Sequence, residues 1–255
     1  MFDTYIAVDW SAKNKPGSRK PQEDAIWVAV KQKSIRTYYF RTRHNFKKFI
    51  TRFLKKDRGR VLIGFDFCLG FPSGFAELIG KSDWKGVWHE IDRVIDDNHD
   101  NSNNRFEGAA RLNSARGPFY GRPDSKDYKS LPKYSPRFPF KGINKVRKTE
   151  IGLGVQPVWK LLGHGSVGSQ SLLGIKMLKQ LRFDILRDIR VWPFEKTANS
   201  KIVMAEIWPG IIKDRIKNYD IKDKKQVIES VKFMEKIEVK DFKGLSGEEG
   251  WILGA

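Results

Sequence analysis

The chain has very little cysteine and no long apolar run. Its one cysteine, Cys68, excludes an internal disulfide framework and a cysteine-based zinc site among the 255 residues. No segment approaches the roughly 20 consecutive apolar residues that a membrane span requires. Met1 to Trp10 also lacks the basic start and apolar run of a signal peptide. We therefore expect a cytoplasmic protein without membrane contact.

Acidic residues are scarce relative to basic ones. The chain has 49 Lys and Arg against 30 Asp and Glu, a formal charge of +19. Such an excess favours a polyanionic partner, above all nucleic acid. Much of it lies between Lys31 and Arg60, where Arg43 and Lys47 are candidate nucleic-acid contacts. The alternative is that these charges form the solvated face of an amphipathic helix.

The first third of the chain alternates strand and helix patterns. A short connector between the second and third strand patterns indicates an antiparallel pair. A helix pattern between two strand patterns indicates a right-handed parallel connection. The patterns predict strands over Thr4 to Asp9, Ala25 to Val30, Ile35 to Phe40 and Arg60 to Asp66, and a helix over His44 to Lys55.

The remainder contains further elements and one irregular stretch. Residues 98–150 are polar, aromatic and proline-rich, which indicates an inserted, loop-rich segment. We therefore expect a single α/β domain over residues 1–255, with a mixed sheet whose first three strands are antiparallel and whose first, fourth and later strands are parallel. The later patterns predict helices over Ser169 to Leu181, Lys222 to Ile237 and Ser246 to Ala255, and strands over Asp188 to Trp192 and Ile202 to Ile207.

Two aspartates, Asp9 and Asp66, each follow an apolar strand pattern. If their strands are parallel neighbours, about 5 Å apart, both carboxylates lie at the sheet edge where open α/β sheets bind ligands. Mg²⁺ prefers such oxygen ligands. Glu206, in a later strand pattern, and Glu249 are further candidate ligands. The alternative is that each acid caps a turn or helix, as Glu249 would do in a capping box with Ser246.

A glycine-rich stretch, Gly163-His-Gly-Ser-Val-Gly-Ser-Gln170, precedes a helix pattern. Glycines allow a ligand to approach the backbone, and free amides at a helix start attract phosphate. The spacing fits neither a P-loop nor a dinucleotide fingerprint, and either serine could instead be an N-cap. The candidate phosphate-binding residues are Gly165, Ser166, Gly168, Ser169 and Gln170.

Arginines alternate with aromatic residues in the inserted segment. Arginines on phosphates and aromatic rings under unstacked bases are typical of single-strand binding. The alternative is a basic, solvated insertion that packs a few aromatic rings on the sheet. The candidate nucleic-acid contacts are Arg111, Arg122 and Arg147.

Several short stretches, spread over nearly the whole chain, resemble an uncharacterised prokaryotic family described as predicted nucleases of the ribonuclease H-like fold. They include Ala7-Val-Asp-Trp-Ser-Ala12, Ile63-Gly-Phe-Asp-Phe67, Gly117-Pro-Phe-Tyr-Gly121, Ala205-Glu-Ile-Trp-Pro209 and Glu249-Gly-Trp-Ile-Leu-Gly254.

The resemblance implies a particular set of acids. It implies a first-strand aspartate, matching Asp9, a fourth-strand acid, matching Asp66, and an acid near a late helix. Glu249 is the positional match for the last, although an aspartate is often seen there, and Glu206 is its alternative or partner. These residues would bind Mg²⁺ or Mn²⁺.

The leading hypothesis is a metal-dependent phosphodiesterase, or nuclease, that acts on nucleic acid. The alternatives are a nucleotide-binding phosphotransferase of the actin-like kind and a non-catalytic nucleic-acid-binding protein. The choice between DNA and RNA and the oligomeric state stay open.

Overall fold

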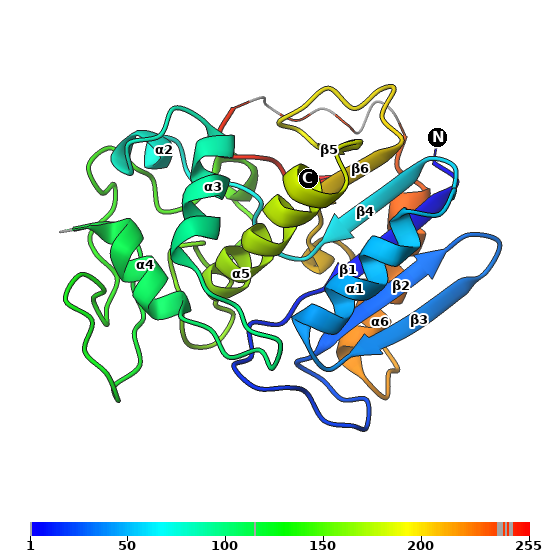
Figure 1. Ribbon diagram of the computed structural model, residues 1–255, viewed down its shortest axis with the longest axis horizontal. Coiled ribbons are helices and arrows are strands. Elements are labelled where there is room, and N and C mark those ends of the chain that lie inside the picture. The colour runs from blue at the N-terminus through cyan, green and yellow to red at the C-terminus, as the bar shows by residue number, and fades with distance from the viewer. Residues whose placement is uncertain (1, 115, 239–241, 243, 245–246) are drawn as a thin grey trace.

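The computed structural model, which describes residues 2–114, 116–238, 242, 244 and 247–255, has a six-stranded mixed sheet at its centre (Figure 1). The strand order is β3-β2-β1-β4-β6-β5. Strands β1 to β3 are antiparallel, whereas β4, β6 and β5 run parallel to β1, which confirms the expected mixed sheet. The strands are β1 (Thr4–Asp9), β2 (Ile26–Lys31), β3 (Ile35–Phe40), β4 (Val61–Phe65), β5 (Ile189–Val191) and β6 (Ile202–Glu206).

Helices cover both faces of the sheet, so the strands are buried and read as continuous apolar runs. On one face, α1 and α5 pack with α3 over a core that contains Ile6, Val8 and Ile63. On the other face, α6 packs over Tyr5, Ala7 and Leu62. The helices are α1 (Arg43–Leu54), α2 (Phe75–Leu78), α3 (Trp84–Val94), α4 (Arg105–Asn113), α5 (Gly168–Lys179) and α6 (Lys222–Glu235).

The segment over residues 98–150 is less irregular than its composition indicates. It contains α4 and a short 3-10 helix, Lys148–Glu150. The buried Asn113 side chain accepts a hydrogen bond from the Phe119 amide (3.0 Å) and donates to the carbonyls of Phe119 (2.9 Å) and Ser130 (2.7 Å). Phe119 in turn packs against Phe71. At least this aromatic ring of the insertion is therefore part of the core.

The expected helix at the carboxyl end is wrong over the described residues 247–255, because this segment forms bends, a turn and one bridge. Ile252 forms a parallel bridge with Glu206, and the Leu253 amide donates to the Glu206 carbonyl (2.9 Å). Pairing with the edge of β6 satisfies backbone groups that a helix would have satisfied internally. Ser246, the expected cap, lies outside the described residues.

None of the helices in the described ranges is long and apolar enough to cross a membrane.

Candidate functional site

Asp9 and Asp66 lie at the carboxyl ends of neighbouring parallel strands. Val8 of β1 pairs with Phe65 of β4, and the Asp66 amide donates to the Val8 carbonyl (3.0 Å). Asp9 and Asp66 come next after this pair, so they lie side by side at one edge of the sheet. In open α/β sheets this edge is where ligands bind.

Both carboxylates also belong to the same face of the sheet. Side chains alternate between faces along a strand, and Tyr5 and Ala7 of β1 belong to the α6 face. Asp9 is therefore on that face. Leu62 of β4 also belongs to the α6 face, and Asp66, an even number of residues later, is therefore on that face too. The two acids thus converge under the start of α6.

A third acid, Asp223, lies in the first turn of α6. Its Oδ2 accepts a hydrogen bond from the Asp24 amide (2.6 Å), just before β2, whose Trp27 pairs with Asp9. Asp223 is therefore at the same sheet edge as the first two acids. The sequence patterns did not single it out. Its signal was an acid in the first turn of a predicted amphipathic helix.

Burial and nearby acids raise the pKa values of all three aspartates. Burial raises the pKa of Asp9 well above its usual range, and the charges of Asp66 and Asp223 add to the effect, while Lys222 opposes it weakly. Burial, then Glu206 and Asp223, raise the pKa of Asp66 to about 7. Burial raises the pKa of Asp223 as well. Such shifts mean that negative charge gathers here without enough positive charge to balance it.

In the described part of the chain, neither Asp9 nor Asp66 makes a side-chain hydrogen bond or an ion pair. Asp9 is 9% exposed, and Asp66 and Asp223 are partly exposed. A cation can therefore reach carboxylate oxygens that have no competing protein partner. This combination suits a divalent metal ion.

Glu206 lies next to this site, but its carboxylate binds other residues of the protein. It pairs in register with Phe65, so its side chain belongs to the face opposite Asp66. There it accepts hydrogen bonds from the Leu69 amide (2.9 Å) and from both terminal nitrogens of Arg147 (2.7 and 2.5 Å). Glu206 is thus the acid of a buried, bidentate ion pair.

Glu249 is likewise engaged by the protein. Its Oε1 accepts from the amide (3.0 Å) and hydroxyl (2.7 Å) of Ser73, and its Oε2 accepts from the Lys148 amide (2.8 Å). Burial acts to raise the pKa of Glu249, but these hydrogen bonds hold it below its usual range. The structure therefore places Asp9, Asp66 and Asp223 at one edge of the sheet, whereas Glu249 joins the loop after β4 to the start of the 3-10 helix.

A second group of metal-ligating side chains lies on the Glu206 side of the sheet. One donor atom each from Cys68, Glu150 and Glu206 lies within 4.8 Å of the others, a set that could hold a metal ion. Arg147 already occupies the space by binding both glutamates. Burial also raises the pKa of the Cys68 thiol well above its usual range, which opposes the thiolate that metal binding needs.

The glycine-rich stretch lies at the start of α5, and its polar groups contact the protein itself. The buried Ser169 hydroxyl donates to the Leu161 carbonyl (2.7 Å) and accepts from Arg105 (3.0 Å). Gln170 donates to the Trp10 carbonyl (2.7 Å). The amides of Gly168 and Ser166 bond to the carbonyls of Lys160 and Gly163, and Gly165 has a positive φ of 68°.

The candidate nucleic-acid contacts divide into buried and accessible residues. Arg43 is 2% exposed and binds Asp97 bidentately, and Arg147 is fully buried with its glutamates. Both guanidinium groups hold the fold together. Arg111 is exposed, Arg122 pairs with Asp127 (3.2 Å), and Lys47 lines a groove beside α1.

No protein-family model, curated protein or solved structure matches this chain. The family resemblance therefore stays a prediction, and the functional argument depends on the geometry of the chain's own residues.

Proposed function

We propose that this protein is a divalent-metal-dependent phosphodiesterase that acts on nucleic acid, with Asp9, Asp66 and Asp223 as the metal ligands. One observation carries the proposal: three acids from separate segments lie on one face, at the carboxyl edge of parallel strands, near enough that, beyond the effect of burial, the charges of Asp66 and Asp223 raise the pKa of Asp9. Nothing in the described ranges balances the charge of the first two with an ion pair. Asp223 replaces Glu206 and Glu249 as the third ligand.

The carboxylates would have distinct tasks around Mg²⁺ or Mn²⁺. Asp9 and Asp66 offer adjacent oxygens on a rigid backbone, since their strands are hydrogen-bonded neighbours. Asp223 lies in the first turn of α6, and a hydrogen bond from the Asp24 amide fixes the position of its carboxylate. When bound in such a shell, a divalent ion lowers the pKa of a water ligand and neutralises charge on phosphoryl oxygens. The protein residues would orient these groups and supply the negative charge that holds the ion.

Two features of the whole chain support nucleic acid as the substrate class. The charge of +19 favours a polyanion. The strand order and the mixed sheet are compatible with a ribonuclease H-like fold, in agreement with the resemblance in the sequence. The phosphotransferase alternative depends on the glycine-rich stretch, whose Ser169 and Gln170 side chains already bond to the protein.

The decisive experiment compares Asp9→Asn with the wild type in Mn²⁺-dependent cleavage of labelled single-stranded and duplex oligonucleotides. We expect a loss on the order of 10²-fold or more, because removing one electrostatic element of an active site has this effect. The control is Asp188→Asn, an exposed acid that precedes β5 at the opposite edge of the sheet. Cleavage retained by Asp9→Asn would contradict the proposal.

A further inference from the structure

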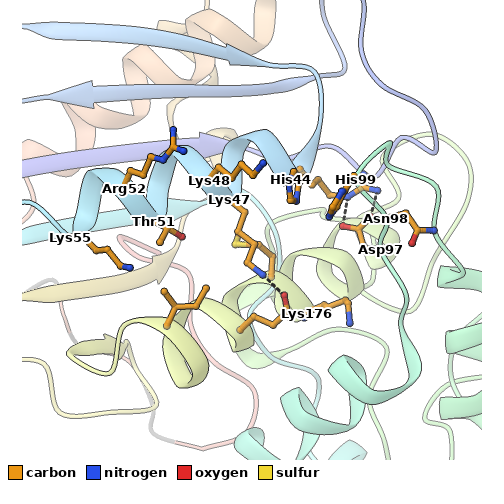
Figure 2. Close-up of a pocket in the computed structure, with 14 residues that line it drawn as sticks. His44, Lys47, Lys48, Thr51, Arg52, Lys55, Asp97, Asn98, His99 and Lys176 are labelled. Carbon is orange, nitrogen blue, oxygen red and sulfur yellow. Dashed lines mark hydrogen bonds and ion pairs between the residues drawn. The ribbon is translucent and has the colours of Figure 1, made fainter.

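A basic groove of about 560 Å³ lies between α1 and α5, on the face of the sheet opposite α6 (Figure 2). In Figure 2, Lys47, Thr51 and Lys55 lie on the side of α1 that faces the groove, and Lys176 of α5 lies across from them. The cationic lining consists of Lys47, Lys48, Arg52, Lys55 and Lys176, with His44 and His99 at one end.

The positive charge of the groove is largely unbalanced. Within the described ranges, four cations of this lining, Lys47, Lys48, Arg52 and Lys55, form no ion pair. Lys47 donates instead to the neutral Gln180 side chain (2.5 Å). The groove's own acid, Asp97, is neutralised by Arg43 (2.6 Å), and Lys176 pairs with Asp92 (3.1 Å). A balanced, solvated helix face would place acids among these lysines, but α1 contains none.

The basic groups also repel one another at close range. Burial lowers the pKa of Lys47, and the charge of Lys176 lowers it further. Burial lowers the pKa of His44 too, with His99 next in effect. The two imidazole rings face each other with centroids 3.8 Å apart. An anion between these groups would stabilise their charged forms.

One end of the groove lies close to the chain that leaves the acid site. Arg43, in the groove lining, donates to the carbonyls of Ser11 (3.0 Å) and Lys13 (2.8 Å). Ser11 directly follows Asp9 and Trp10, and Lys13 lies two residues further along the chain. A strand that lies along α1 would therefore leave the groove beside the segment that carries Asp9.

We propose that this groove binds the phosphodiester backbone of a nucleic-acid strand and guides it over the sheet edge toward the three acids. The inference deepens the proposed function and rests on it for the direction of the strand. The lysines would contact phosphates, and because phosphate contacts carry no sequence information, we expect this binding to be independent of sequence. His44 and His99 would hold the phosphate nearest the acids.

The test measures binding without cleavage. Full-length protein is titrated into fluorescein-labelled single-stranded DNA and RNA in EDTA, and anisotropy is followed at several salt concentrations. Lys47→Gln/Lys55→Gln should weaken binding at least about 10-fold and reduce the slope of log Kd against log salt by about 1.4, since each of the two lost phosphate contacts removes about 0.7. Arg52→Gln/Lys55→Gln, which changes two exposed side chains, should weaken binding in the same direction even if Lys47→Gln disturbs folding.

The matched control is Lys196→Gln/Lys217→Gln, which removes the same charge from two exposed lysines outside the groove. An equal loss in this control, or no oligonucleotide binding by the wild type, would overturn the groove assignment. Asp9→Asn should bind the oligonucleotide as the wild type does. Cleavage by Asp9→Asn would defeat the metal-site proposal alone, and groove variants that bind normally would defeat this inference alone.

Discussion

At the scale of single residues, buried charges here fall into two kinds. Arg147 is enclosed, but two glutamates and a backbone carbonyl accept its hydrogen bonds. Asp9 is equally enclosed, yet its neighbours are other acids. The first arrangement is self-sufficient, and removing one partner of such a pair is strongly destabilising. The second keeps a residual electrostatic cost that protons or metal ions can remove.

Asp66→Asn tests that cost through pH. The folded-state pKa of Asp66, about 7, is above its unfolded value, so its stabilising contribution is complete below about pH 4 and disappears as the pH rises through 7. At pH 8 in EDTA, Asp66→Asn should therefore be more stable than the wild type, by about 2 kcal/mol in urea denaturation. At pH 4 the two should be nearly equal, because the folded acid is then protonated and resembles asparagine, and the unfolded acid is only about half ionised. A difference that is the same at both pH values would contradict the assignment.

At the scale of elements, local patterns located most strands and helices but not all. Strands β1 and β3 have the predicted bounds, and α1 and α5 differ from prediction by one or two residues. The helix α3 was not predicted, although Asp83 caps it by accepting from the Gly86 amide (2.8 Å). The carboxyl end was predicted wrongly as a helix, since its partner β6 is distant in sequence.

The packing of α5 gives a prediction at this scale. A Cβ added to Gly174 would lie 2.2 Å from the Phe67 ring, closer than real contacts allow. Alanine gains about 1 kcal/mol in helix propensity, whereas overpacking costs about 1–3 kcal/mol. We expect overpacking to prevail, so Gly174→Ala should lower the midpoint of thermal unfolding. Phe67→Leu in the same chain should recover part of the loss, and simple additivity of the two changes would contradict direct contact.

At the scale of the whole molecule, the sheet separates the two proposed sites. The three acids belong to the α6 face, and the basic groove lies under α1 on the other. Figure 1 shows α1 and α6 on opposite sides of the same strands. Metal binding and strand binding should therefore be separable by mutation.

Mn²⁺ should raise the stability of the whole protein by binding only the folded state. At 100 times its dissociation constant, a ligand adds about 2.7 kcal/mol, or several degrees in the unfolding midpoint for a chain of this size. Differential scanning fluorimetry should show the shift at pH 8 and a smaller one at pH 5, where protons compete for Asp66. Asp223→Asn should reduce the shift and Lys47→Gln/Lys55→Gln should leave it intact. An equal shift in Asp9→Asn would contradict binding at this site.

The sequence by itself determined the strand-end aspartates, the central sheet pattern and the excess of positive charge, because periodicity, β-forming residues and composition are local properties. Only the tertiary structure decided which acids act together. Asp223 joins Asp9 from 214 residues away (223 − 9) because α6 packs on the same face. Glu206 leaves the set because strand alternation turns it toward Arg147. The position of each acid depends on the sheet face it lies on and on the residues it contacts. Long-range packing fixes both, and neighbouring residues in the sequence do not.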